Sequence, residues 1–212
     1  RLAEPTSGKI WFDGIEVTAL KGQALRDFRK QAQIVFQDPY SSLNPRITIG
    51  DAISEPMIVH DIETDRTRCR NRVCDLLEQV GLQAEHYDRY PHEFSGGQRQ
   101  RICIARALAV SPRLIICDES VSALDVSVQA QVLNLLNRLK EERHLTYIFI
   151  SHDLSVVRFM SDRVVVMYNG QPVEINEADA LFEHPLNAYT QKLIDALPGK
   201  THYFNSTSGP ML

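Results

Sequence analysis

Two short apolar runs, each ending in polar residues, constrain the fold more than any other feature of this sequence. Residues 114–117 (LIIC) are followed by two acids, and residues 147–150 (YIFI) are followed by a Ser-His pair. Between the runs, apolar residues recur at i, i+3, i+4 and i+7 over 132–139, which is the spacing of one helix face. This order predicts a βαβ unit, in which two buried parallel strands carry polar residues to one edge of a sheet.

The stretch before this unit predicts further strands. Residues 9–17 contain an Asp13-Gly14 pair between two short apolar segments, which is typical of a tight β-hairpin. Residues 31–36 (QAQIVF) indicate another strand, which leads into Gln37 and a polar stretch, 37–45, that two prolines mark as a loop. We therefore expect an α/β fold with a mixed sheet and an antiparallel β subdomain at its front.

A helical insert is predicted between these two parts. Apolar residues at helical spacing over 73–80 predict a helix that ends near Gly81, and a second helix is expected to follow Ser95-Gly96-Gly97 and to cover 98–109. Later, Asn169-Gly170 indicates a hairpin. The expected organisation is an antiparallel β part at 1–46, a helical insert at 47–110, a core at 111–176, and two short helices with a tail at 177–212.

Composition excludes several other classes of protein. The 212 residues carry 23 Lys and Arg against 27 Asp and Glu, a net charge of −4, so a broad basic face for nucleic acid is not expected. The longest apolar runs have about five residues, far below the ~20 that a membrane helix needs. Four cysteines without C-x-x-C spacing are expected to be reduced packing residues.

Four features could carry chemistry, and each has a structural alternative. The run 95–98 (SGGQ) before a helix could present N–H groups to a phosphate, or could simply be a turn and helix cap. Asp118 and Glu119 could supply a Mg²⁺ ligand and a general base, or could cap the next helix. His152 could contact an anionic ligand, or could be a hydrogen-bonded residue at the rim of the core. Gln37 alone indicates nothing.

Taken in order, these features resemble the nucleotide-binding domain of ABC transporters. The resemblance covers residues 5–197 and rests on Gln37, FSGGQRQR at 94–101, LIICDE at 114–119, SALD at 122–125 and ISHD at 150–153. It implies a P-loop ATPase type of fold, with ATP and Mg²⁺ as the bound groups. It also implies a head-to-tail dimer of two nucleotide-binding subunits, identical or different.

The resemblance assigns a role to each candidate residue. Gln37 is implied to be the Q-loop glutamine, which contacts the metal, and Asp118 the Walker B ligand of Mg²⁺. Glu119 is implied to polarise the attacking water, and His152 to be the switch histidine at the γ-phosphate. The remaining implied nucleotide contacts are the signature residues, which act on ATP held by the second subunit, and the D-loop aspartate: Ser95, Gly96, Gly97, Gln98 and Asp125.

Three further segments are similar to the oligopeptide, dipeptide and nickel importer branch of the family. They are QDPYSSLNPR at 37–46, DESVSALDVSVQAQ at 118–131, and His184-Pro185 with YTQ at 189–191. The branch implies an ATPase subunit bound peripherally at the cytoplasmic face of the inner membrane, with permease subunits and no nucleic acid as partners. One departure is Ser120, where family members commonly have Pro; both carboxylates before it are retained.

Two other functions stay open at this point. A soluble ABC-type ATPase of DNA repair or translation would share the signature and Walker B residues, but should lack the 37–46 segment and the late His-Pro and Tyr-Thr-Gln residues. A non-catalytic fragment would only offer its signature face to a partner. The sequence begins without Met and holds no G-x-x-x-x-G-K-[S/T] motif, so we expect a clipped or naturally truncated domain whose P-loop strand and helix are missing. The transported substrate is not encoded in these residues.

We predict that the 212-residue chain alone binds MgATP weakly and does not hydrolyse it. The charge-assisted hydrogen bonds of a P-loop contribute roughly 1.5–3 kcal/mol each, and no such motif occurs in these residues. Calorimetric titration with MgATP, beside a chain extended upstream through a P-loop, measures the difference. Micromolar binding with phosphate release by the short chain would contradict the prediction.

Overall fold

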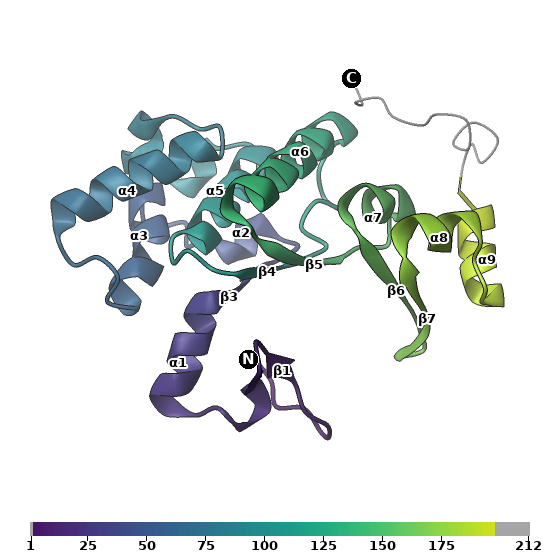
Figure 1. Cartoon of the computed structure of the whole chain (residues 1–212). Coiled ribbons are helices and arrows are strands. Elements are labelled where there is room, and N and C mark those ends of the chain that lie inside the picture. The colour runs from purple at the N-terminus through teal and green to yellow at the C-terminus, as the bar shows by residue number, and fades with distance from the viewer. Residues whose placement is uncertain (1, 198–212) are drawn as a thin grey trace. The chain divides into compact units, whose positions relative to one another are not determined.

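The computed structural model describes residues 2–197, which form two compact units (Figure 1). The first unit is Arg1–Ile150 and the second is Ser151–Leu212. The expected four-part division of the chain stays a prediction. In the described range, no helix is both long enough and apolar enough to cross a bilayer.

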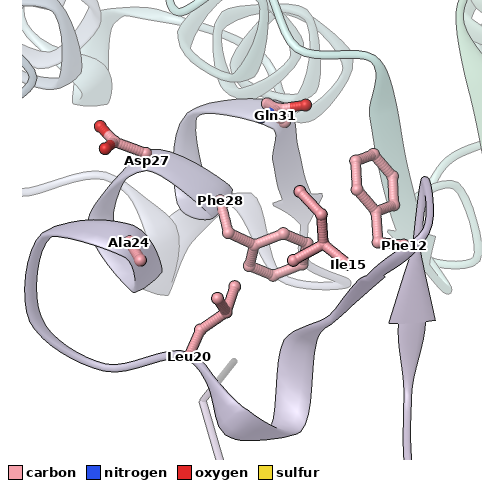
Figure 2. A pocket seen from close by; sticks show the side chains of 7 residues that line it. All are labelled: Phe12, Ile15, Leu20, Ala24, Asp27, Phe28 and Gln31. Carbon is pink, nitrogen blue, oxygen red and sulfur yellow. The ribbon is translucent and has the colours of Figure 1, made fainter.

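The first unit opens with the predicted hairpin. β1 (Trp11–Phe12) and β2 (Ile15–Glu16) pair antiparallel around the Asp13-Gly14 turn, where both residues have positive φ. A 3₁₀ turn, η1 (Val17–Ala19), leads to α1 (Gly22–Gln31), which the sequence analysis did not predict. A small, mostly apolar pocket of about 220 Å³ lies between the hairpin and α1, and Figure 2 shows the side chains that line it. The rings of two of these residues, Phe12 and Phe28, pack edge to face with their centroids 5.5 Å apart.

The predicted βαβ unit is confirmed. β3 (Ala32–Val35), β4 (Leu114–Asp118) and β5 (Thr146–Ile150) form a parallel sheet in the order β3-β4-β5, and α6 (Val126–Arg143) connects β4 to β5. One face of the sheet is buried at Ile115 and Cys117. The helix α6 lies on this face, where Tyr147 Oη donates to the Leu136 carbonyl of α6 at 3.1 Å. The opposite face leaves Ile148 and Ile150 about half exposed, at 50% and 47%.

Helices also fill the predicted insert at 47–110. They are α3 (Ile49–Val59), α4 (Arg66–Gln79), η2 (Ala84–Asp88), η3 (Pro91–Glu93) and α5 (Gly96–Leu108). The expected helix end at Gly81 is confirmed, because α4 stops at Gln79 and Gly81 has a φ of 76°. Arg101 of α5 donates to the Val80 carbonyl at 3.0 Å, which satisfies one of the acceptors that a helix end leaves open.

The segment 37–45 is not wholly a loop, as the prolines suggested, because α2 occupies Pro39–Ser42. Asp38 caps this helix by accepting from the N–H groups of Tyr40 at 2.8 Å and Ser41 at 3.3 Å. Proline suits the first turn of a helix, where its missing N–H is not needed. The hydrogen bond from the Tyr40 N–H is the largest cause that holds the pKa of Asp38 below its ordinary value, and the hydrogen bonds from Ser41 add to it.

The second unit contains the predicted hairpin and two short helices. After α7 (Leu154–Met160), β6 (Arg163–Tyr168) and β7 (Gln171–Glu177) pair antiparallel around Asn169-Gly170, and α8 (Ala178–Glu183) and α9 (Ala188–Asp195) follow. A small core that includes Val164, Leu181 and Ile194 holds these elements together. The tail expected from residue 200 lies outside the described residues.

The α/β class is confirmed. In the described residues the antiparallel pairs β1-β2 and β6-β7 are separate from the parallel sheet β3-β4-β5. All four cysteines are free, and burial raises the pKa of Cys103 to about 11 and of Cys117 to about 12. Thiols with such pKa values are unreactive, which agrees with their expected role as packing residues.

Gly97 packs the first turn of α5 against the first turn of α6. A Cβ at Gly97 would lie 2.2 Å from Val128 Cγ1, whereas a Cβ at Gly96 would meet only Leu124 Cδ2 at 3.8 Å. We predict that Gly97→Ala lowers the free energy of unfolding by about 1–3 kcal/mol through overpacking, and that Val128→Ala in the same chain restores part of it. Urea denaturation measures both effects. Gly96→Ala is the matched control, and equal losses for the two glycine variants would contradict the prediction.

Glu174 fixes the connection between α8 and α9. Its side chain is 8% exposed, and its two oxygens accept from the N–H groups of Leu186 at 2.9 Å and Asn187 at 3.0 Å. Burial alone would raise the pKa of Glu174, but these N–H groups help to outweigh burial, so the pKa lies below its ordinary value.

Because the pKa of Glu174 is lower folded than unfolded, its carboxylate stabilises the second unit above the unfolded-state pKa of about 4.3. This contribution is lost as the pH falls through the lower, folded-state pKa. Glu174→Gln should therefore cost about 1–3 kcal/mol at pH 7 and less in acid. Thermal unfolding across pH measures this, with the exposed Glu177→Gln as control. A loss independent of pH would contradict it.

Candidate functional site

The carboxyl ends of β3 and β4 build the candidate site. These strands pair in parallel with Val35 opposite Cys117, so the residues that follow each strand emerge at the same edge of the sheet. There Gln37 Nε2 donates to Glu119 Oε2 at 2.7 Å, across 82 positions of sequence, and lies 3.4 Å from Ser122 Oγ. The structure thus brings together two residues that the sequence analysis singled out separately.

The backbone of Glu119 has an uncommon conformation that other contacts hold in place. Its φ is 47°, in the left-handed region, which costs a non-glycine residue on the order of 1–2 kcal/mol. Its N–H donates to the Ile150 carbonyl at 3.0 Å, while its carbonyl accepts from Ser122 N at 3.1 Å and Ser122 Oγ at 2.9 Å. Strain of this kind is typical of functional sites, and here it turns the chain sharply just after β4.

Asp118 is the last residue of β4 and is half-buried beside Glu119. Because the Gln37 amide uses its nitrogen toward Glu119, its oxygen is the atom that it offers to a cation. A carboxylate and an amide oxygen fit Mg²⁺, which takes one or two protein oxygens and completes its shell with phosphates and water. Over residues 2–197 no group of three or more His, Cys, Asp or Glu side chains could hold a metal ion.

Ser95 lies at the N-cap of α5, as the sequence analysis expected. Its Oγ accepts from Gln98 N at 3.3 Å, and Gln98 Oε1 in turn accepts from Ser95 N at 3.0 Å, which is a capping box. The first N–H groups of a helix have no intrahelical acceptor, so the turn that contains Gly96 and Gly97 is suited to an anion. The oxygen of the Gln98 side chain is already hydrogen-bonded to the Ser95 N–H within this cap.

The two remaining candidate residues lie elsewhere. Asp125 is exposed at the N-cap of α6, and its side chain makes no cap hydrogen bond there. His152 is exposed in the second unit, two residues after the end of β5. Asp153 beside it caps α7, accepting from Ser155 N at 2.9 Å. The assigned roles of both residues at the nucleotide stay predictions.

The sequence analysis missed the residues that connect this edge to the helices. The Tyr40 ring of α2 stacks on the Arg99 guanidinium of α5 at 3.8 Å, and Arg106 of α5 donates to the Ser42 carbonyl at the end of α2. Asp38-Pro39, an N-cap residue followed by a first-turn proline, was the available sequence signal for α2. No local pattern pairs Tyr40 with Arg99, because the contact depends on how the two helices pack.

Comparison with known proteins adds an independent finding. The chain is 54% identical over 199 residues to the oligopeptide transport ATP-binding protein OppF of Bacillus subtilis, covering 93% of this chain and 65% of that protein. It is 53% identical over 198 residues to the glutathione import ATP-binding protein GsiA of Pectobacterium atrosepticum, covering 93% and 32%. The chain thus spans less than two thirds of the length of these relatives.

Solved structures of ATP-binding cassettes resemble the fold of this chain. The dimeric, post-hydrolysis ATP-binding cassette MJ0796 bound to ADP and Pi matches with a TM-score of 0.72 and 29% identity over 84% of this chain and 76% of that chain. The cbiO1 protein of Clostridium perfringens, part of the ABC transporter complex cbiONQ, matches with a TM-score of 0.76 and 26% identity over 93% and 76%. The model of the family described as ABC transporter matches residues 1–122, more than half of the sequence. The chain therefore belongs to the ABC transporter family.

Proposed function

We propose that this chain is part of the ATP-hydrolysing subunit of an importer of peptides or related small solutes. The observation that carries the proposal is the contact of Gln37 with Glu119, beside Asp118, at one edge of the parallel sheet. Relatives named for oligopeptide transport and glutathione import support the importer assignment. These names favour the importer over a soluble ATPase of DNA repair or translation.

Each residue at the sheet edge has a distinct task in this proposal. Asp118 and the Gln37 amide oxygen would hold Mg²⁺, which would supply charge neutralisation at the phosphates. Glu119 orients a water molecule toward the γ-phosphate and accepts its proton. The Gln37 amide and Ser122 fix the Glu119 carboxylate and backbone, so its direction is set before water arrives.

The proposal includes a second nucleotide-binding subunit. The capped turn at Ser95, Gly96 and Gly97 offers helix N-terminal N–H groups to a phosphate held by that subunit, with Asp125 beside the shared interface. His152 is proposed to contact the γ-phosphate. The cited dimeric cassette supports a dimer as the working assembly.

Permease subunits are the other proposed partners, with the protein bound peripherally at the cytoplasmic face of the inner membrane. A shallow depression of about 80 Å³ between α2 and η3 supports this docking face, with walls formed by Tyr40, Leu43, Pro45, Pro91, His92 and Arg99. Because α2 begins two residues after Gln37, a partner that shifts α2 would also shift the contact with Glu119.

Glu119→Gln tests the catalytic part. In a chain extended upstream through a P-loop, this variant should retain MgATP binding but hydrolyse ATP about 100- to 10,000-fold more slowly, because a positioned base is lost. The control is Glu141→Gln, an exposed carboxylate on α6. Phosphate release and calorimetric binding are measured together. Undiminished turnover in the Glu119 variant would assign the base to another residue.

Photo-crosslinking tests the docking part. Probes at exposed Ser41 of α2 and Ile58 of α3 should crosslink to cytoplasmic loops of a permease subunit, whereas a probe at Glu141 should not. Mass spectrometry identifies the crosslinked partner in membranes that contain the assembled protein. Recovery of DNA-repair or ribosomal proteins instead would contradict the importer assignment.

A further inference from the structure

Arg101 of α5 joins three helices of the first unit through one guanidinium. The helix α5 contacts both α4 and α6 (Figure 1). Arg101 Nη1 donates to the Val80 carbonyl, just past the end of α4, at 3.0 Å, and its Nη2 donates to Gln131 Oε1 of α6 at 3.1 Å. Because the guanidinium is planar, its two nitrogens fix the directions of both bonds at once. Arg101 therefore holds α5 against two other helices with a defined geometry.

The end of α4 is built to receive this guanidinium. Gly81 has a φ of 76°, and a Cβ at this position would lie 2.5 Å from Arg101 Nη1, so glycine leaves the space that the nitrogen occupies. The same end of α4 is bound to α6, because the Gln79 carbonyl accepts from Arg138 at 2.5 Å and Gln79 Oε1 accepts from Arg143. The bond from Arg101 thus attaches α5 to a helix end that α6 already holds.

Two contacts, about one helical turn apart, attach α5 to α6. At the first contact Gly97 approaches Val128 so closely that a Cβ would lie 2.2 Å from Val128 Cγ1. At the second contact Arg101 binds Gln131. One contact alone would let α5 pivot on α6, whereas two contacts fix the angle between the two helix axes. The N–H groups of the first turn of a helix point along its axis, so this angle sets the direction in which α5 presents them.

We propose that Arg101 is a positioning residue, which directs the N–H groups of the turn at Ser95, Gly96 and Gly97 toward the phosphate held by the second subunit. The inference deepens the proposed function and rests on it. In this role Arg101 touches neither nucleotide nor metal and acts only through the direction of α5. Loss of that direction therefore slows hydrolysis in the dimer, but leaves the affinity of a single subunit for its own MgATP unchanged.

Variants of Gln131 test the inference without disturbing the core, because this residue is exposed on α6. In a chain extended upstream through a P-loop, Gln131→Ala removes the acceptor and should lower kcat about tenfold, with the calorimetric Kd for MgATP unchanged. Gln131→Glu supplies a charged acceptor and should retain the wild-type kcat. Arg101→Gln should lower kcat at least as far as Gln131→Ala, and the two changes together should lower it no further than Arg101→Gln. Arg66→Gln, an exposed charge on α4, is the control.

Residual dipolar couplings of the backbone N–H groups in α5 and α6 give a second readout that needs no hydrolysis. The angle between the two helix axes should change in Gln131→Ala, but not in Gln131→Glu or Arg66→Gln. If the wild-type extended chain hydrolyses ATP, a Gln131→Ala variant that changes only one of kcat and the angle, or neither, would overturn the inference alone and leave Arg101 as a stabilising contact at the end of α4. Absence of hydrolysis by the wild-type extended chain would overturn the proposed function, and the inference with it.

Discussion

The parallel pairing of β3 with β4 is the constraint on which the rest of the first unit depends. Its register sets Ile34 opposite Ile116, and so brings the ends of two strands that are distant in sequence to one edge. A slip by one residue would turn Ile115 and Cys117 from the buried face to the open one, which strongly disfavours any other register. Hydrophobic burial therefore also places Gln37 within hydrogen-bonding distance of Glu119.

The same edge is mechanically connected to the helical insert. Gln37 is followed by a capped helix, α2, and α2 is bound to α5 by the Tyr40–Arg99 stack and by Arg106. The first turn of α5 carries the Ser95 cap. The residue proposed to act in water activation lies just before α2, the proposed docking residues lie on α2, and the proposed phosphate-binding turn begins α5. Because each of these segments contacts the next, a shift in one would move the others.

Most of the fold could be predicted from local pattern, since the strands LIIC and YIFI, the α6 face and both hairpins all have periodicities or turn residues that act over a few positions. The contacts of the site could not. Gln37 meets Glu119 only because of a long-range register, and Tyr40 meets Arg99 only because two helices pack. The positive φ of Glu119 has no sequence signal either, because a glycine would be the usual choice there.

We propose that the edge of the sheet formed by β3 and β4 binds the divalent metal of a hydrolytic site. Paramagnetic Mn²⁺ in place of Mg²⁺ tests it most directly, by NMR on a chain extended upstream through a P-loop and mixed with ATP. We expect Mn²⁺ to broaden the side-chain amide signals of Gln37, and Asp118→Ala to remove most of this broadening at the same MnATP concentration. Sharp Gln37 signals in the wild type, or equal broadening in the Asp118 variant, would contradict it.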